Sequence, residues 1–166
     1  MQSSSNYYSS HIICSQTNLN LIPLVFSLEQ MARLVEAMTL LPGLQTLSLS
    51  SNAKTGLWRR GDLLGEKLAL LLKKSTSLKR LYISGESGAS SLGNALTPLV
   101  EALGQNRSLE TLSLGGNSLP GNAIKALARS LKTNRTLKAL ELDHNHITWK
   151  LLLIVRIGFI TAVLVI

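Results

Sequence analysis

The chain has 166 residues, enough for one domain with a sizeable core but too few for a large multidomain enzyme. It carries 17 Lys and Arg residues against 9 Asp and Glu residues, and its formal net charge of +8 favours anionic partners or surfaces. Hydrophobic residues make up 45% and charged residues 16%, so the chain is too apolar for intrinsic disorder. The single cysteine, Cys14, excludes an intrachain disulfide and a cysteine-based zinc site, and it favours a reducing compartment.

The first ten residues are polar, and they lack the basic start and the long apolar run of a secretory signal. We therefore expect residues 1–15 to be a disordered N-terminus and the protein to be cytoplasmic. The N-x-S/T sequons at Asn106 and Asn134 are accordingly interpreted as structural residues of repeat junctions rather than as glycosylation sites.

One leucine pattern recurs along the chain and predicts its organisation. The spacing L-x-x-L-x-L-x-x-N occurs at Leu109, Leu112, Leu114 and Asn117, and again at Leu137, Leu140, Leu142 and Asn145. Similar units begin near Leu44 and Leu78, and a degenerate first unit begins at Gln16. The last two leucines of the pattern lie two positions apart, so their side chains share one face of a short strand. The asparagine follows where the chain turns, and its amide can pair with backbone groups that the turn leaves unpaired.

Between these strands, apolar residues at helical spacing predict helices. The first helix follows Ser27, the second follows Asp62, the third includes Pro98 in its first turn, and the fourth has Asn122 as its N-cap. The expected apolar stripes are Leu28, Met31, Leu34, Val35 and Met38; Leu63, Leu64, Leu68, Leu71 and Leu72; Leu99, Val100 and Leu103; and Ile124, Leu127, Ala128 and Leu131.

A unit of one strand and one helix cannot bury its apolar sides alone, so neighbouring units must stack. We therefore predict an α/β solenoid, a short horseshoe over residues 16–148 with units near 44, 78, 109 and 137. Parallel strands are expected on its concave face and helices on its convex face.

The strand pattern joined to a helix resembles the leucine-rich repeats of the ribonuclease-inhibitor type. The junction L-x-x-N-R-S-L at Leu103 recurs at Leu131 as L-x-x-N-R-T-L. Within that superfamily, residues 96–100 (LTPLV), 116–119 (GNSL) and 143–148 (DHNHIT) resemble the C-terminal repeats of the CARMIL proteins. The resemblance implies an actin-regulatory scaffold that binds and uncaps capping protein. In that family the capping-protein-binding segment lies in a tail beyond the repeats, so the resemblance carries no contact residue over to this chain.

Strand alternation predicts which side chains the concave face presents to solvent. The expected partner-binding residues are Thr46, Ser48, Arg80, Tyr82, Thr111, Ser113, Glu141 and Asp143. An array of small polar groups with one aromatic residue and an acidic end is typical of a protein-docking surface and not of a substrate pocket. Arg80 and Tyr82 are of the residue types that most often anchor an interface.

Basic residues crowd the second unit. The candidate basic patch consists of Arg59, Arg60, Lys73 and Lys74, and further cations, Lys125, Arg129 and Lys132, follow helical spacing opposite an apolar stripe. These cations form either a solvated helix face or a docking surface for acidic protein or anionic lipid. Aromatic residues are too sparse among them for single-stranded nucleic-acid recognition, so no nucleic-acid partner is expected.

Residues 149–166 form an apolar tail whose charge beyond Lys150 is Arg156 alone. The sixteen residues 151–166 would span about 24 Å as a helix, short of a hydrocarbon core of about 30 Å, and a mid-helix arginine is costly there. Trp149 and Lys150 suit a membrane interface, which leaves three interpretations open: a membrane anchor, a terminal cap of the solenoid, or an artefact of the reading frame.

No set of side chains forms a catalytic, cofactor-binding or metal-binding motif. Residues 85–89 (GESGA) lack the final glycine of a nucleophile elbow, and Asp62 stands where a phosphate loop requires lysine. His144 and His146 flank a turn asparagine, so we interpret them as solvent-facing turn residues. We therefore predict no enzyme, no cofactor and no small-molecule substrate.

Together these features predict a protein-interaction scaffold of leucine-rich repeats, and the resemblance to the CARMIL proteins implies that it regulates actin assembly through capping protein or related partners. We expect it in the cytoplasm, associated with the cytoskeleton or with an anionic membrane surface. The alternatives are a fragment of a leucine-rich sensor or GTPase regulator, and an adaptor anchored in a membrane by the apolar tail.

Overall fold

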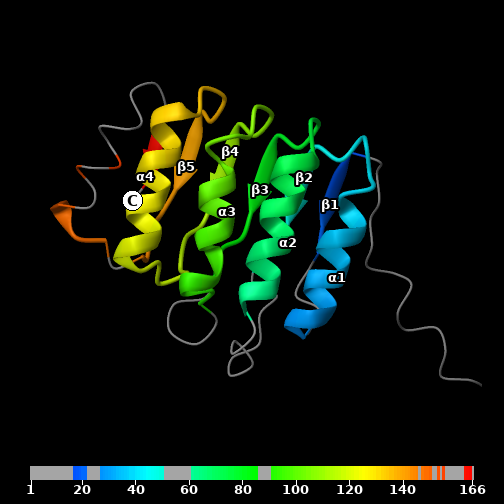
Figure 1. Ribbon diagram of the computed structural model, residues 1–166, viewed down its shortest axis with the longest axis horizontal. Helices are drawn as coiled ribbons and strands as arrows, with labels where there is room; N and C mark the ends of the chain where they lie inside the picture. The colour runs from blue at the N-terminus through cyan, green and yellow to red at the C-terminus, as the bar shows by residue number, and fades with distance from the viewer. Residues whose placement is uncertain are drawn as a thin grey trace, which may run out of the picture.

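The computed structural model describes residues 17–21, 27–50, 61–85, 91–145, 147–150, 153, 155 and 163–165. Short strands alternate with helices along them (Figure 1). The strands are β1 (Asn18–Asn20), β2 (Thr46–Ser48), β3 (Arg80–Tyr82), β4 (Thr111–Ser113), β5 (Ala139–Glu141) and β6 (Val163–Val165). The helices are α1 (Leu28–Met38), α2 (Gly61–Lys74), α3 (Thr97–Ala102) and α4 (Gly121–Thr133), and a 3₁₀ helix, η2 (Gly93–Leu96), leads into α3.

The strands join one six-stranded sheet in chain order, and every neighbouring pair is parallel. The register keeps equivalent leucines adjacent, because Leu81 pairs with Leu47 on one side and with Leu112 on the other. Helices α1 to α4 lie side by side in one layer over one face of this sheet (Figure 1). The predicted α/β solenoid of parallel strands and helices is confirmed.

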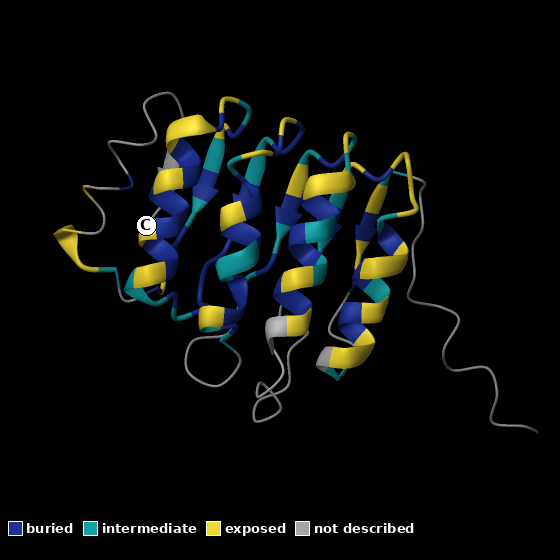
Figure 2. Ribbon diagram, in the orientation of Figure 1, coloured by how far each residue is buried: buried dark blue, intermediate teal, exposed yellow. Residues whose placement is uncertain are grey.

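The core lies between the sheet and the helix layer, where Figure 2 shows buried residues on the strands and along the helices. The leucines expected to point inward from the last two complete repeats do so, because Leu112, Leu114 and Leu140 are 0% exposed and Leu142 is 1% exposed. Full burial of one such side chain contributes about 1.5–3 kcal/mol. Each repeat therefore adds its own layer to one continuous core.

The two turn asparagines act as the sequence predicts. Asn117 is buried, and its Nδ2 donates to the backbone carbonyl oxygens of Leu114, 3.1 Å away, and of Ile83 in the preceding unit. The Asn117 Oδ1 accepts from the backbone N–H of Leu92 at 3.3 Å. The corresponding amide of Asn145 bonds in the same way one unit later. These side chains tie the turn of each unit to its neighbour.

The predicted helix start after Ser27 is confirmed, whereas the starts after Asp62 and at Asn122 are wrong, since α2 already includes Gly61 and Asp62. Ser27 caps α1 through a reciprocal capping box, in which its hydroxyl accepts from the backbone N–H of Gln30 and the Gln30 side chain accepts from the Ser27 N–H. Asn122 is not the N-cap of α4, because the helix already begins at Gly121 with Pro120 in the cap position. The extended backbone of Pro120 starts this helix, and the Asn122 side chain instead donates to Asn94 at 3.2 Å.

The apolar stripe of α2 is narrower than the sequence suggests. Leu64 and Leu68 are buried as expected, but Leu63 is 39% exposed. It lies one position before Leu64, about 100° around the helix, and lines a groove towards α3 beside Pro98. The side chain of Leu28, from the stripe expected on α1, lies outside the described residues.

Part of the C-terminal tail adds a strand that the repeat pattern does not predict. Strand β6 pairs with β5, with Leu164 opposite Leu140, and Val155 before it is buried. Within the described ranges, no helix is both long and apolar enough to cross a membrane. Residues 1–15, Arg156 and much of the remaining tail lie outside these ranges, so the proposed domain division and the three interpretations of the tail stay predictions.

Candidate protein-binding surface

The register of the sheet arranges the predicted partner-binding residues in two rows across the strands. One row contains Thr46, Arg80, Thr111 and Ala139, and the other contains Ser48, Tyr82, Ser113 and Glu141. We call these two rows, together with Asp143 after β5, the strand face. The intervening leucines are buried on the opposite side, towards the helices. Because neighbouring strands lie about 4.8 Å apart, the backbone positions of Tyr82 and Glu141 are about 10 Å apart.

The basic residue of the strand face, Arg80, is held in place by Thr46 on the neighbouring strand. Arg80 is exposed, and its Nε donates to the Thr46 hydroxyl at 3.1 Å. This bond fixes the root of the guanidinium group, and the two Nη atoms make no further hydrogen bond or ion pair within the described residues. Tyr82 is half-buried two positions along the same strand. The arrangement presents a charged and an aromatic group side by side.

Ser113 lies in the predicted row but is much less exposed than strand alternation suggests. It is only 2% exposed, and its hydroxyl bonds with the Ser84 hydroxyl at 2.8 Å. Its short side chain lies between Tyr82 and Glu141 in the register. Ser113 is therefore engaged within the strand face, and its predicted contact with a partner stays a prediction.

The opposite part of the strand face is acidic. Glu141 is half-buried, and within the described chain no hydrogen bond or ion pair engages its carboxylate. Asp143 bonds with the His144 ring Nδ1 at 2.8 Å, and His144 has a positive φ of 55°. The Asp143 carboxylate fills the space beside Gly115, where an added Cβ would stand 2.4 Å from the Asp143 Oδ1. The strand face thus runs from Arg80 to a carboxylate pair.

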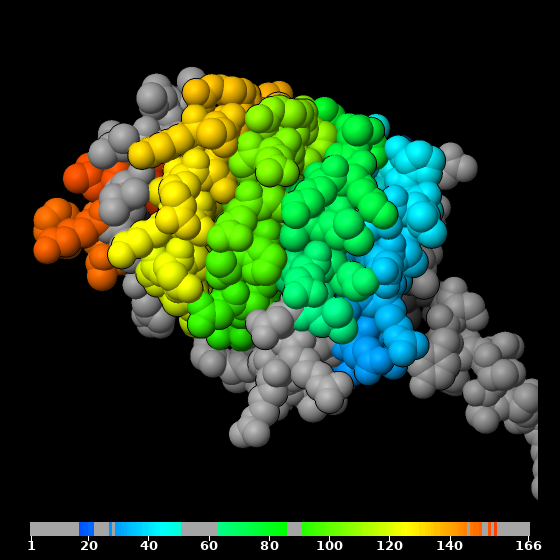
Figure 3. All heavy atoms as spheres, viewed as in Figure 1, coloured from blue at the N-terminus to red at the C-terminus, as the bar shows by residue number. Residues whose placement is uncertain are grey.

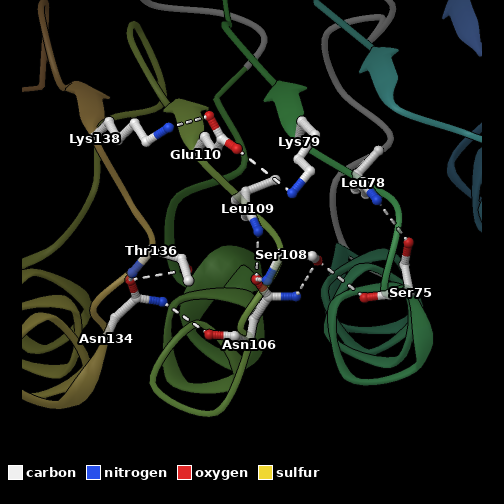
Figure 4. Close-up of polar contacts among 10 residues, drawn as sticks. All are labelled: Ser75, Leu78, Lys79, Asn106, Ser108, Leu109, Glu110, Asn134, Thr136 and Lys138. Atoms are coloured by element: carbon white, nitrogen blue, oxygen red, sulfur yellow. Dashed lines mark hydrogen bonds and ion pairs between the residues drawn. The ribbon is translucent and has the colours of Figure 1, made fainter.

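A separate row of charges lies where the chain enters the strands, and it is satisfied internally (Figure 4). Glu110 binds Lys138 at 2.7 Å and Lys79 at 3.4 Å through its two carboxylate oxygens. The hydrogen bond from Lys138 is the main cause that lowers the pKa of Glu110 below its ordinary value of 4.5. Lys79 adds to this effect. These charges hold three units in register, and they are less available to a partner than Arg80 or Glu141.

The two sequon asparagines belong to the scaffold beneath this row (Figure 4). Asn134 Nδ2 donates to the carbonyl oxygens of Leu103 at 2.8 Å and Asn106 at 3.1 Å, and its Oδ1 accepts from the Leu137 N–H at 2.8 Å. Asn106 makes equivalent bonds one unit earlier, including one with the Leu72 carbonyl oxygen. The two residues are 7% and 4% exposed respectively, so both amides are buried and engaged. Their expected role as repeat-junction residues fits these bonds.

The candidate basic patch is only partly visible. Lys73 and Lys74 are exposed in the last turn of α2, whereas Arg59 and Arg60 lie outside the described residues. Positive side chains suit the carbonyl end of a helix, which gives Lys73 and Lys74 a structural role as well.

Among the residues that the structure describes, no three His, Cys, Asp or Glu side chains come together as a metal site. His146 lies outside those residues.

The fold and the sequence together define the class of protein. Residues 105–128 and 133–148 match the family model described as Leucine Rich repeat. The chain therefore carries leucine-rich repeats and folds as the solenoid that such repeats build. No curated protein matches the sequence.

Two solved structures share this fold. The tropomodulin C-terminal domain of Caenorhabditis elegans is 16% identical with a TM-score of 0.66, and the match covers 86% of this chain and 81% of that chain. A structure of leiomodin-1 actin-binding site 2 is 20% identical with a TM-score of 0.67, and the match covers 86% of this chain and 78% of that one. At these identities the likeness establishes the fold alone.

Proposed function

We propose that the chain is a non-enzymatic scaffold that binds a partner protein on the strand face. The observation that carries the proposal is the order of side chains across the sheet: an exposed guanidinium on β3, an aromatic ring beside it, and carboxylates at and after β5. Parallel strands in register form a rigid, extended surface. Such a surface suits a protein segment better than a small molecule, which needs an enclosed pocket.

We further propose that the partner is a protein of the actin-regulatory machinery, with actin and capping protein as the two candidates. Two observations support this choice. The repeat residues resemble those of the CARMIL proteins, and one structure of similar fold is the actin-binding site 2 of leiomodin-1. The CARMIL resemblance supports this machinery and not a capping-protein site on the strand face, because in that family capping protein binds a tail beyond the repeats. A partner of this kind would place the protein at the cytoskeleton.

The proposal is tested with purified proteins. The chain is immobilised and offered capping protein and, separately, actin filaments, and retention is measured. We expect one of the two to be retained by the natural chain. The double variant Arg80→Glu with Glu141→Arg keeps the net charge but reverses both ends of the strand face, and it should lose at least about tenfold in affinity because opposed charges become like charges.

A matched control reverses two charges on the helix layer instead. The variant Glu29→Arg with Arg33→Glu also keeps the net charge, and both side chains are exposed on α1, where they pair with each other. It should bind like the natural chain. If neither capping protein nor actin is retained, the assignment to the actin machinery is wrong. If a retained partner binds the strand-face variant as well as it binds the natural chain, the strand face is not the interface.

A further inference from the structure

A second charged surface lies on the helix layer, at the α4 end of the solenoid. Figure 3 shows the atoms of α4, in yellow, at the surface of this layer beside those of α3. It consists of five exposed cations: Arg107 in the loop after α3, Lys125, Arg129 and Lys132 on α4, and Arg135 in the loop after α4. We call these residues the α4 basic surface. Its helix, Gly121–Thr133, contains no acidic residue at all.

The charges of this surface are not neutralised by neighbours. The ion pairs among the described residues lie on α1, between α1 and α2, around Glu110, and between Asp143 and His144. None of them includes a cation of the α4 basic surface. Helix α1 shows the contrast. There Arg33 pairs with Glu29 at 2.8 Å, and Glu36 pairs with Lys67 of α2 at 2.7 Å. A solvated helix face with paired charges is thus present in this protein, and α4 differs from it.

The surface also has a recess. A groove of about 490 Å³ runs between α3 and α4, and Arg107 and Arg129 both line it. Its lining hydroxyls are engaged with the scaffold, because Thr133 donates to the Gly104 carbonyl oxygen at 3.2 Å. Glu101 also lines the groove, so two guanidinium groups face one carboxylate. The net charge of the lining therefore favours an incoming anionic group.

One of the two guanidinium groups is positioned in advance. The Nη1 atom of Arg107 donates to the carbonyl oxygens of Gly104 and Asn106, both at 2.9 Å. Fixing a long side chain before binding reduces the conformational entropy that binding must remove. A guanidinium group presents a planar fork of donors that matches a carboxylate.

We propose that the α4 basic surface binds an acidic segment of a partner protein, with one carboxylate in the groove between Arg107 and Arg129. Further carboxylates meet Lys125 and Lys132, whose positions on α4 are about 10 Å apart along the axis. The exposed apolar residues favour a protein segment over an anionic membrane. The large apolar side chains exposed in the described chain are Leu40, Leu41, Leu63, Trp149 and Leu153, and none of them lies on α4 to insert into lipid.

The probe is a fluorescently labelled, alanine-rich helical peptide with glutamates at positions i, i+4 and i+7, and binding to the full chain is followed by fluorescence anisotropy. We expect binding that weakens as salt rises, and none by the same peptide with glutamine in place of glutamate. The variant Arg107→Glu with Arg129→Glu should lose at least about tenfold in affinity. The single variant Arg129→Ala, which introduces no new charge, should lose a few-fold.

The matched control is Lys73→Glu with Lys74→Glu, which changes the net charge by the same amount on exposed positions of α2. It should bind the peptide within about twofold of the natural chain. An equal loss in this control would mean that net charge, or the candidate basic patch that includes Lys73 and Lys74, drives binding in place of the α4 basic surface, and the proposal would be wrong. It would also be overturned if the natural chain did not bind the glutamate peptide, whether or not it bound vesicles containing phosphatidylserine. None of these outcomes bears on the strand face, which lies on the other side of the sheet.

Discussion

The side-chain amide of Asn145 donates to the backbone carbonyl oxygen of Leu114 at 2.8 Å, across the boundary between two repeats. The same Nδ2 donates to the Leu142 carbonyl oxygen at 3.0 Å, and its Oδ1 accepts from the Leu119 N–H at 3.0 Å. Because Asn145 is 3% exposed, bulk water does not reach these backbone groups in the folded chain, and truncation of the side chain costs free energy. A single side chain therefore satisfies backbone groups of two units.

We expect Asn145→Ala to lower the free energy of unfolding by about 2–4 kcal/mol, because it leaves several buried backbone groups unpaired. Asn145→Asp should also destabilise, since a carboxylate can accept from Leu119 but cannot donate to the two carbonyl oxygens. Urea denaturation measures both. The control is Asn122→Ala on the exposed surface of α4, which should cost less than about 1 kcal/mol. Equal losses at the two asparagines would contradict the bridging role of Asn145.

Gly116 and Gly93 both have a positive φ but differ in the space around them. Substituting each one therefore distinguishes the cost of backbone strain from the cost of a steric clash. Gly116 has a φ of 67°, and a Cβ added there would stand 2.4 Å from the backbone oxygen of Gly85. Gly93 has a φ of 46°, but the nearest atom to its added Cβ, the Ser118 oxygen, is 4.0 Å away. The two positions share the left-handed backbone and differ in free space.

We expect Gly93→Ala to cost about 1 kcal/mol, which is the strain of the left-handed conformation alone. Gly116→Ala should cost at least about 3 kcal/mol, because the backbone of the neighbouring unit must also move. Thermal and urea unfolding of both variants give the comparison. A Gly116→Ala variant as stable as Gly93→Ala would show that the turns of adjacent repeats are not held as closely as the structure has them.

The leucine frame was predictable because burial of its side chains follows directly from strand alternation. Leu112 and Leu140 have the same chemistry and the same position in the repeat, so one physical rule places both. The state of Ser113 was not predictable in this way. Its burial depends on a hydroxyl bond with Ser84, whose proximity arises only when β3 and β4 are in register.

Strand β6 was missed for a different reason. Its residues Val163–Val165 lack the leucine and asparagine marks, and they lie in a tail that is apolar throughout. In such a segment no alternation distinguishes a strand from a helix, and pairing with β5 decides the outcome.

The α4 basic surface could be predicted from the sequence only in part. Sequence spacing placed Lys125, Arg129 and Lys132 on one face, but only the folded chain brings Arg107 to the same groove.

The width of the apolar stripe on α2 gives a direct test of the packing. Leu68 is 0% exposed within the core, whereas Leu63 is 39% exposed beside the groove to α3. Leu68→Ala should cost about 2–5 kcal/mol through the lost burial and the cavity that remains. Leu63→Ala should change the free energy of unfolding by less than about 1 kcal/mol. A large loss at Leu63 in urea denaturation would mean that α2 is rotated relative to the orientation described.

The last prediction concerns pH and the row of charges at Glu110. Since Lys138 and Lys79 lower the pKa of Glu110 in the folded chain, its ionised form favours folding at pH values above the ordinary pKa of 4.5. As the pH falls below 4.5 and through the lower folded pKa, the carboxylate becomes protonated in both states and this contribution disappears. The natural chain should therefore exceed Glu110→Gln in stability near neutral pH, and the difference should shrink on acidification.

Urea denaturation at a series of pH values from about 7 to about 3, which spans the ordinary pKa of a glutamate, measures this difference. The same comparison is then made in a chain carrying Lys79→Met and Lys138→Met, which removes both amines but keeps most of their aliphatic length. In that background, chains with and without the Glu110→Gln substitution should no longer diverge in stability as the pH rises, because the carboxylate has lost the two partners that lower its pKa. A difference that persisted unchanged without the lysines would show that another part of the chain perturbs Glu110.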